Sequence, residues 1–176
     1  MTPFYKFNRQ NLKGFTLLEL LIVISIIAIL SVALVMVLNP AEILKKSRDS
    51  QRISDLNTIK TAVGIYLTST STPTLTCWTA TSTSATTTGS IYKIDGTGWI
   101  PVDLSTLTGG SPISNLPLDP VNTGANVYWY KCNNTDKTFE VSATLESAAY
   151  TTDDNKAAKD GGDDATRYEI GTKLNQ

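Results

Sequence analysis

The sequence predicts an α+β protein in which a long N-terminal helix precedes a small β-rich domain. Residues 15–38 form an apolar run, residues 41–67 carry apolar side chains at helical spacing, and residues 91–170 contain short strand-like segments between turn residues. The chain of 176 residues has a net charge of −1, no histidine and two cysteines. The charge gives no electrostatic reason to expect a nucleic-acid partner, and the absence of histidine excludes histidine-based triads and zinc sites.

The apolar run, 24 residues from Phe15 to Leu38, is long enough to cross a membrane. At about 1.5 Å per helical residue it measures roughly 36 Å, against about 30 Å for the bilayer core. Glu19 is its only charged residue. A carboxylate in such a segment is unfavourable by a few kcal/mol, in order of magnitude, unless it has a partner. Glu19 is therefore a candidate functional residue.

The segment before this run, residues 1–14, is basic. It contains no acidic residue and three cationic ones, Lys6, Arg9 and Lys13. A basic flank remains in the cytoplasm, so the residues after the membrane helix are expected outside it. The segment is not a conventional secretory peptide, because the apolar run would be retained and no small-residue cleavage site follows Leu38.

A second, amphipathic helix is predicted over residues 39–67. Asn39 suits the N-cap and Pro40 the first helical position. Together with the apolar run it is expected to form one long helix, bent or locally melted near Pro40. Its charged residues between positions 45 and 55 are expected to form a solvated face. Its apolar stripe comprises Ile53, Leu56, Ile59, Val63 and Tyr66.

Residues 68–176 are expected to form a globular, β-rich head. Residues 68–90 are mostly serine and threonine and predict an exposed loop, either O-glycosylated or unmodified. A short helical turn is expected at 103–107 and weak helix at 145–159. Strands are predicted at 91–94, 98–102, 126–132, 137–143 and 167–170, with a hairpin loop at 133–136.

The residues Gly14-Phe15-Thr16-Leu17-Leu18-Glu19-Leu20-Leu21 resemble the processing site of type IV prepilins and of the related pseudopilins of type II secretion. The resemblance combines a short basic leader ending in Gly14, a phenylalanine directly after it, a glutamate four residues further on and an unbroken apolar helix. It implies that a prepilin peptidase cuts between Gly14 and Phe15 and then methylates the new Phe15 amino terminus. The mature chain would have 162 residues.

The same resemblance implies a fold, an assembly and partners. The family fold is a long helix, transmembrane in its first half, packed on a small antiparallel β-sheet. Glu19 would meet the terminal amine of a neighbouring subunit in a filament, where each charge offsets the burial of the other. The implied partners are copies of the chain and other pilins, the peptidase and methyltransferase, and an inner-membrane assembly platform with its ATPase. The subunit would cross the cytoplasmic membrane once before it joins an extracellular filament.

Other interpretations remain open. The chain could be a pseudopilin of a type II secretion or competence system, or a membrane-anchored adhesion or binding module that does not polymerise. No catalytic constellation is found, so an enzyme is not expected. A group of aromatic residues is expected to belong to the core and surface of the sheet rather than to a ligand site: Trp78, Trp99, Tyr128, Trp129 and Tyr130.

Two further sets of residues are candidates for bonds that stabilise the head. Cys77 and Cys132 are expected outside the cytoplasm, where a disulfide between them is favoured. In the chain-entropy model this bond would stabilise the folded domain by about 4 kcal/mol. The alternative is two free, buried thiols. Asp160, Asp163 and Asp164 lie in a glycine-containing turn of the kind that binds calcium, and major pseudopilins hold calcium in a loop near their carboxyl terminus. The alternative is a solvated acidic loop.

Overall fold

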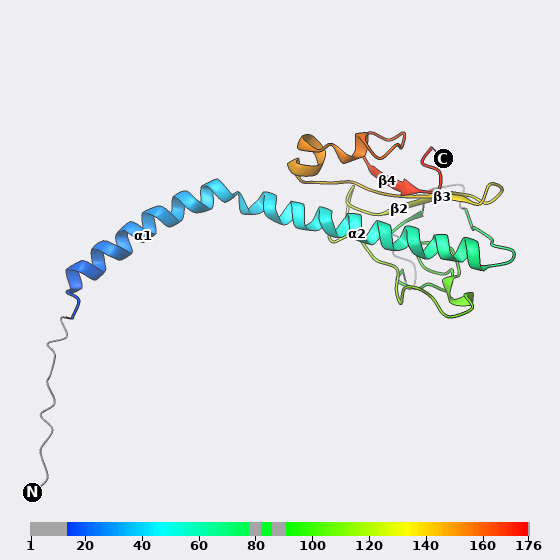
Figure 1. The fold of residues 1–176 in the computed structure, drawn as a ribbon, viewed down its shortest axis with the longest axis horizontal. Coiled ribbons are helices and arrows are strands. Elements are labelled where there is room, and N and C mark those ends of the chain that lie inside the picture. Colours follow the sequence, from blue (N-terminus) through cyan, green and yellow to red (C-terminus); the bar gives the residue numbers. More distant parts are fainter. Residues whose placement is uncertain (1–13, 78–81, 86–90, 176) are drawn as a thin grey trace, which may run out of the picture. The chain divides into compact units, whose positions relative to one another are not determined.

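The computed structural model describes residues 14–77, 82–85 and 91–175. The predicted leader charges and Trp78 lie outside these ranges. The chain divides into two compact units, residues 1–40 and 41–176. The first unit contains helix α1, Leu17–Leu38, and the second contains helix α2, Pro40–Ser69, except for Pro40, together with a β-sheet (Figure 1). The second unit is called the head below.

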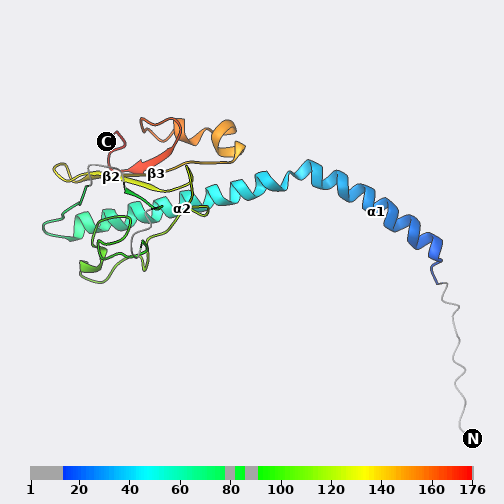
Figure 2. The same ribbon diagram turned by 180° about the vertical axis from the view of Figure 1, so that it is seen from behind.

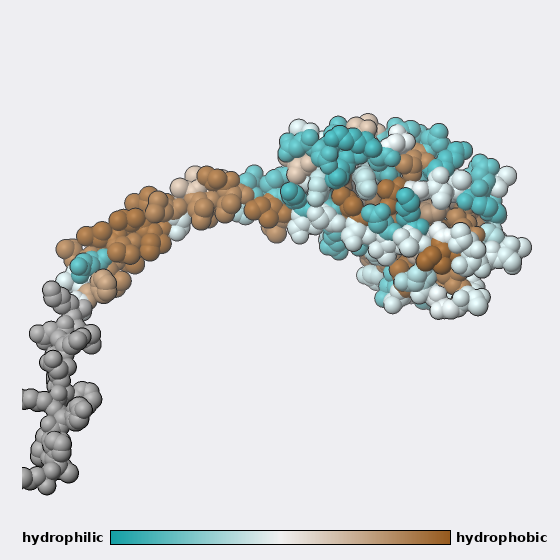
Figure 3. All heavy atoms as spheres, in the orientation of Figure 1, coloured by the Kyte–Doolittle hydropathy of each residue, from teal (hydrophilic) through white to brown (hydrophobic). Residues whose placement is uncertain are grey.

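Helix α1 has no buried residue, Glu19 is its only charged residue, and the face in view is apolar along most of its length (Figure 3). Among the described residues it is the one helix long and apolar enough to cross a membrane. Its two serines hydrogen-bond within the helix, Ser25 Oγ donating to the Leu21 carbonyl and Ser31 Oγ to the Ile27 carbonyl, both at 2.7 Å. Their hydroxyl groups therefore need no partner outside the helix.

The helix is interrupted between α1 and α2, as predicted. Asn39 ends α1 in the left-handed conformation, with φ at 41°. Asparagine tolerates this conformation better than most residues, and Pro40 then begins α2 without needing a backbone donor. The predicted local break near Pro40 is confirmed.

The head contains one sheet of four antiparallel strands in the order β1-β2-β3-β4. The predicted hairpin is confirmed, because β2 and β3 pair around a turn in which Asn133 Oδ1 accepts the N–H groups of Thr135 and Asp136. The predicted last strand is confirmed as β4. The bounds are Ser82–Thr83 for β1, Trp129–Asn133 for β2, Thr138–Ala143 for β3 and Tyr168–Gly171 for β4.

The strands predicted at 91–94 and 98–102 are wrong, because turns, bends and irregular backbone occupy these residues. A strand requires successive hydrogen bonds to one neighbour. Here three carbonyl groups within residues 91–94 accept from three separate positions along the chain: Ile91 from Trp99, Tyr92 from Leu116 and Ile94 from Leu104. The predicted helical turn that follows is confirmed as the 3₁₀ helix η1, Leu104–Thr106.

Residues 68–90 also differ in part from the predicted loop. Thr68 and Ser69 complete α2, and strand β1 lies within the serine- and threonine-rich stretch. The two-residue strand β1 is held by β2, and Ser84 directly after it is fully buried. Composition alone gives no sign of so short an edge strand. Residues 78–81 and 86–90 lie outside the described ranges.

Helix α2 covers one face of the sheet, and residues 144–167 lie over the other face (Figures 1 and 2). The covering segment contains the π-helical turn η2, Ala149–Asp153, and the 3₁₀ turn η3, Lys156–Ala158. The core between helix and sheet confirms the apolar stripe, except that Ile53 is only half-buried. Its main members are Leu56, Ile59, Ala62, Val63 and Tyr66 of α2 with Tyr130, Phe139, Val141, Ala143 and Ile170 of the sheet.

The solvated face predicted for the charged residues in the first half of α2 is wrong at Asp49 and Arg52, which are both 0 % exposed. The sequence does not show that distant carboxylates and backbone N–H groups surround these two charges. The other charged residues of this stretch are exposed or partly exposed. Three of the predicted aromatic residues, Trp99, Tyr128 and Tyr130, are buried in the core, as expected.

Candidate functional site

Gly14 and Phe15, the expected cleavage pair, directly precede α1 and are exposed, Phe15 to 92 %. A Cβ atom at Gly14 would meet no other atom within 4 Å, and its backbone is not in the left-handed region. The fold therefore does not require glycine at this position. A requirement for glycine would come from a partner that handles the segment.

Thr16 and Glu19 close the N-terminus of α1 with a reciprocal capping box. Glu19 N–H donates to Thr16 Oγ1 at 3.2 Å, and Glu19 Oε2 accepts from both the Thr16 N–H and the Thr16 hydroxyl at 2.8 Å. The spacing Thr-x-x-Glu is a known signature of this cap, so the sequence already carried the signal. The Glu19 carboxylate therefore has donors in its own chain and remains an acceptor suited to an ammonium group.

Four charged residues of the head form a group that we call the charge cluster: the buried Asp49, Arg52 and Asp119, and the partly exposed Glu146. Arg52 lies at its centre. Its guanidinium binds Asp119 through two parallel hydrogen bonds of 2.6 and 2.9 Å. Its Nη1 also donates to Asp49 at 2.8 Å and to Glu146 at 2.7 Å. One arginine thus connects α2 to two loops that follow it by 67 and 94 residues.

The charge cluster also satisfies backbone groups of the segment that covers the sheet. Asp49 accepts the N–H groups of Glu146 and Ser147 and the Ser147 hydroxyl. Burial by itself would lower the pKa of Arg52, but its hydrogen bonds to Asp119, Glu146 and Asp49 outweigh burial and raise it. Hydrogen bonds from Arg48 and Arg52 lower the pKa of Glu146. Arg52 and Glu146 therefore both stay charged near neutral pH, and the cluster acts as a structural clamp.

The acidic turn was predicted to bring Asp160, Asp163 and Asp164 together around a cation. Asp160 instead accepts the Gly162 N–H at 2.8 Å and the Glu169 N–H at 2.7 Å. Asp164 accepts the N–H and the hydroxyl of Thr166, and these bonds lower its pKa. Both carboxylates are thus used to shape the turn.

Asp163 belongs to a different group, the carboxylate cluster, which consists of Glu140 of β3, Asp163 and Glu169 of β4. One carboxylate oxygen from each of the three lies within 4.8 Å of the others. Glu140 and Glu169 are each 1 % exposed, whereas Asp163 is exposed. Burial and the neighbouring Glu169 carboxylate raise the pKa of Glu140 to about 7.

Sequence reasoning missed both glutamates of the carboxylate cluster. They alternate with core residues along β3 and β4, so their side chains point to the face of the sheet away from α2. Such positions are usually solvated. Only the packing of residues 144–167 over that face buries them, and that packing has no local signal in the sequence.

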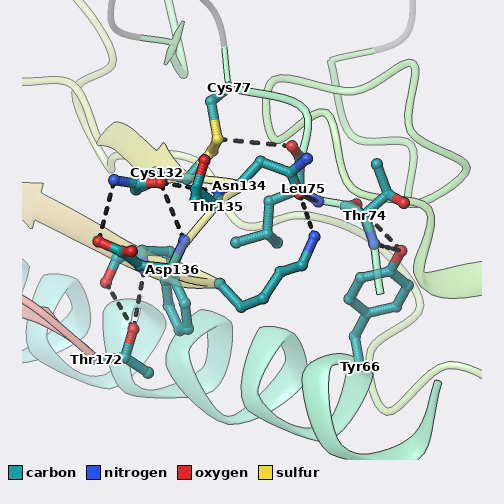
Figure 4. Close-up of a disulfide and its surroundings, with 12 residues drawn as sticks. Tyr66, Thr74, Leu75, Cys77, Cys132, Asn134, Thr135, Asp136 and Thr172 are labelled. Atoms are coloured by element: carbon teal, nitrogen blue, oxygen red, sulfur yellow. Dashed lines mark hydrogen bonds between the residues drawn. A yellow bond between two sulfur atoms is a disulfide. The ribbon is translucent and has the colours of Figure 1, made fainter. Parts of the chain in front are cut away.

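The predicted disulfide is present between Cys77 and Cys132, with their Cα atoms 5.3 Å apart (Figure 4). It connects the stretch after α2 to strand β2. Beside it, Asn134 Oδ1 of the hairpin turn accepts the Leu75 N–H at 2.9 Å. The disulfide and this hydrogen bond together attach residues 75–77 to the β2–β3 hairpin.

Loss of the disulfide is expected to lower the free energy of unfolding of the head by about 2–4 kcal/mol, since the open chain gains conformational entropy when unfolded. Urea denaturation with and without reductant measures the change. The double variant Cys77→Ser/Cys132→Ser is the control and should not respond to reductant. If both thiols could be alkylated before reduction, the disulfide would be absent from the protein.

Comparison with known protein families identifies one matching family model, the prokaryotic N-terminal methylation motif, over residues 9–35. The matched residues include the exposed Gly14–Phe15 pair, the Thr16–Glu19 cap and most of α1. Comparison with curated proteins and with solved structures gives no match.

Proposed function

We propose that this chain, which carries the N-terminal motif typical of type IV pilins and pseudopilins, is a structural subunit of a type IV pilus or pilus-like filament. The observation that carries the proposal is the match at residues 9–35, because it falls on a helix without buried residues behind an exposed glycine. A prepilin peptidase would cut between Gly14 and Phe15, methylate Phe15 and release a mature subunit that polymerises through α1.

The physical basis of polymerisation is the exposure of α1. A helix in which Glu19 is the only charged residue needs apolar surroundings on almost all sides, which lipid supplies first and neighbouring helices supply later. The transfer between these two environments is nearly neutral, because lipid tails and packed aliphatic side chains are similarly apolar. Specific register must then come from packing and from a polar pair, and Glu19 with the Phe15 amine of the next subunit is that pair.

Each segment takes one role in this proposal. Residues 1–14 are the cytoplasmic leader, and residues 15–38 cross the cytoplasmic membrane and afterwards form the filament core. Residues 39–67 connect the core to the head, and residues 68–176 form most of the head that faces outward. The partners are identical or related subunits, the peptidase and methyltransferase, and a membrane assembly platform with its ATPase.

Glu19→Ala is expected to leave cleavage intact and to lower the yield of filaments at least about tenfold, because the amine of Phe15 would be buried without a counter-charge. Mass spectrometry of the amino terminus measures cleavage, and sheared surface material measures filaments. Ser25→Ala is the matched control on the same helix, since Ser25 bonds only within α1. Wild-type yield from Glu19→Ala would contradict the mechanism.

Glu19→Gln separates the two roles of this side chain. Glutamine can still accept hydrogen bonds from Thr16, so the capping box survives, but it has no charge for the amine. We expect it to fail in assembly as alanine does. Normal assembly by Glu19→Gln would show that capping alone matters. A different outcome is that the wild type and every variant are cleaved but remain monomeric in the membrane. That result would favour an anchored binding module instead of a filament subunit.

A further inference from the structure

We propose that the first two turns of α2 dock on the surface of a bilayer that contains anionic phospholipid, while the subunit is still in the membrane. Ile43 and Leu44 enter the boundary between the headgroups and the acyl chains, and Lys46 and Lys156 bind lipid phosphates. The inference rests on the part of the proposed function that places α1 in the membrane. It goes beyond that function, because it assigns the head a lipid contact of its own.

Two neighbouring apolar side chains at the start of α2 lie open on the surface of the head. Ile43 is 55 % exposed and Leu44 is 61 % exposed. The most exposed large apolar residue further along the helix is Ile65, at 39 %. Apolar surface is more favourable away from water, so this pair favours an apolar partner from outside the head.

The length of the chain between α1 and this pair keeps the bilayer within reach. Helix α1 has 22 residues. At about 1.5 Å per residue it measures roughly 33 Å, so it fills a hydrocarbon core of about 30 Å and ends near the headgroups. Ile43 follows the last residue of α1, Leu38, by five positions, and five residues span at most about 18 Å even when fully extended. Whatever the angle between α1 and α2, the pair remains close to the headgroup layer.

The charges beside the apolar pair match an anionic bilayer surface. Residues 40–48 contain three basic residues and one acidic residue. Lys46 is exposed and forms no ion pair with any residue that the structure describes. A lysine can lay its apolar stem along the acyl boundary and keep its ammonium group at the phosphates. The start of α2 therefore offers a cation to the same surface that the apolar pair enters.

A second segment of the head brings another lysine to the same place. Lys46 Nζ lies 6.0 Å and Lys156 Nζ 5.1 Å from the centre of the Tyr150 ring. Asp154 binds both Lys156 and Lys159, so these three side chains together retain one positive charge. Tyrosine is enriched at membrane–water interfaces, because its ring is apolar and its hydroxyl group remains hydrated. Two lysines around one tyrosine thus form a group suited to phospholipid headgroups.

The test measures how close labelled positions lie to lipid in the full-length protein, reconstituted into vesicles. Each protein carries a fluorophore on one introduced cysteine, and the native cysteines do not react because they form a disulfide. Ser47→Cys labels an exposed position one turn after Ile43. Thr61→Cys labels the same helix about 21 Å further on, and Ser31→Cys labels α1. Quenching by nitroxide-labelled lipid is compared between phosphatidylcholine vesicles with and without phosphatidylglycerol.

We expect lipid to quench the Ser47 label more than the Thr61 label, and quenching at Ser47 to rise with the content of phosphatidylglycerol. A lysine near an anionic surface favours the bound state about fivefold, so Lys46→Gln and Lys156→Gln should each lower the ratio of docked to undocked heads by about that factor. Lys60→Gln removes an exposed lysine of α2 outside the proposed contact and is the matched control, without effect. High salt should act as the two lysine variants do.

The Ser31 label separates this inference from the proposed function. If the Ser31 label is quenched and the Ser47 label is not, α1 is in the membrane but the head does not dock, and the inference is wrong. If neither label is quenched, α1 is not inserted, and the proposed function fails as well. Quenching at Ser47 that is unchanged without phosphatidylglycerol and in Lys46→Gln would also overturn the inference, since the lysines would then bind no phosphate. Protection of the Ser47 label in filaments but not in vesicles would assign the apolar pair to a neighbouring subunit instead.

Discussion

Gly14→Glu is expected to accumulate as the uncut chain, with no detectable protein beginning at Phe15. The reason lies outside the fold, because a Cβ atom at Gly14 would meet no atom within 4 Å among the residues that the structure describes. A peptidase that draws an extended segment into its active site would meet both the added volume and the added negative charge. Intact-mass measurement distinguishes the uncut chain from the processed chain, because the processed chain lacks residues 1–14 and carries one added methyl group.

The control for Gly14→Glu places the same charge elsewhere in the leader. Asn8→Glu adds a carboxylate six residues upstream and should still be cut. Both variants should unfold at the temperature of the wild type, because the core of the head contains no residue before Leu56. Cleavage of Gly14→Glu at the wild-type level would count against processing by a prepilin peptidase.

Arg52→Met is expected to lower the free energy of unfolding of the head by about 3–5 kcal/mol. Methionine fills much of the space of arginine, so the effect measures lost charge pairing rather than a cavity. Without the guanidinium, Asp49 and Asp119 would stay buried and would lose their nearest cation. Urea denaturation of the full-length protein, followed by tryptophan fluorescence, measures the change as a lower midpoint.

Arg48→Met is the matched control for Arg52→Met. Arg48 lies one turn earlier on α2, is about one-third exposed and has one ion pair, to Glu146 at 2.9 Å. Pairs of this kind contribute about 0–1 kcal/mol. Equal losses from the two variants would show that the charge cluster does not stabilise the head more than a surface pair does.

The charge cluster also predicts a dependence on pH. The folded pKa of Glu146 lies below its ordinary value of 4.5. Its contribution to stability is therefore complete above about pH 4.5 and is lost as the pH falls through the lowered folded pKa. As the pH is lowered below 4.5, the urea midpoint of unfolding should decrease more steeply for the wild type than for Glu146→Gln.

The sequence predicted those elements whose signals are local. The apolar run that becomes α1, the break at Pro40 and the hairpin around Asn133 each depend on a few consecutive residues. The false strands at 91–102 also came from local alternation, but there the carbonyl groups bond to three separate segments. Alternation reports which side chains are buried, and it does not report which segment supplies the hydrogen bonds.

The two buried clusters could not be predicted, because their burial comes from distant parts of the chain. The sequence predicts Arg52 as one of several charges on a solvated helix, because it does not show that the fold places Asp119 and Glu146 beside it. The sequence places Glu140 on the outward face of a strand, and it does not show that residues 144–167 cover that face. In contrast, the Thr-x-x-Glu spacing of Thr16 and Glu19 is a local signal that does predict the cap.

That cap bears on how easily a filament would come apart. In the proposed filament, a subunit that lost its neighbour would still have the N–H and hydroxyl of Thr16 as donors to its Glu19 carboxylate. That carboxylate would therefore not face hydrocarbon without a donor, and the cost of detaching the subunit would be lower. If the proposed assembly is correct, the fibre could then shorten as well as grow.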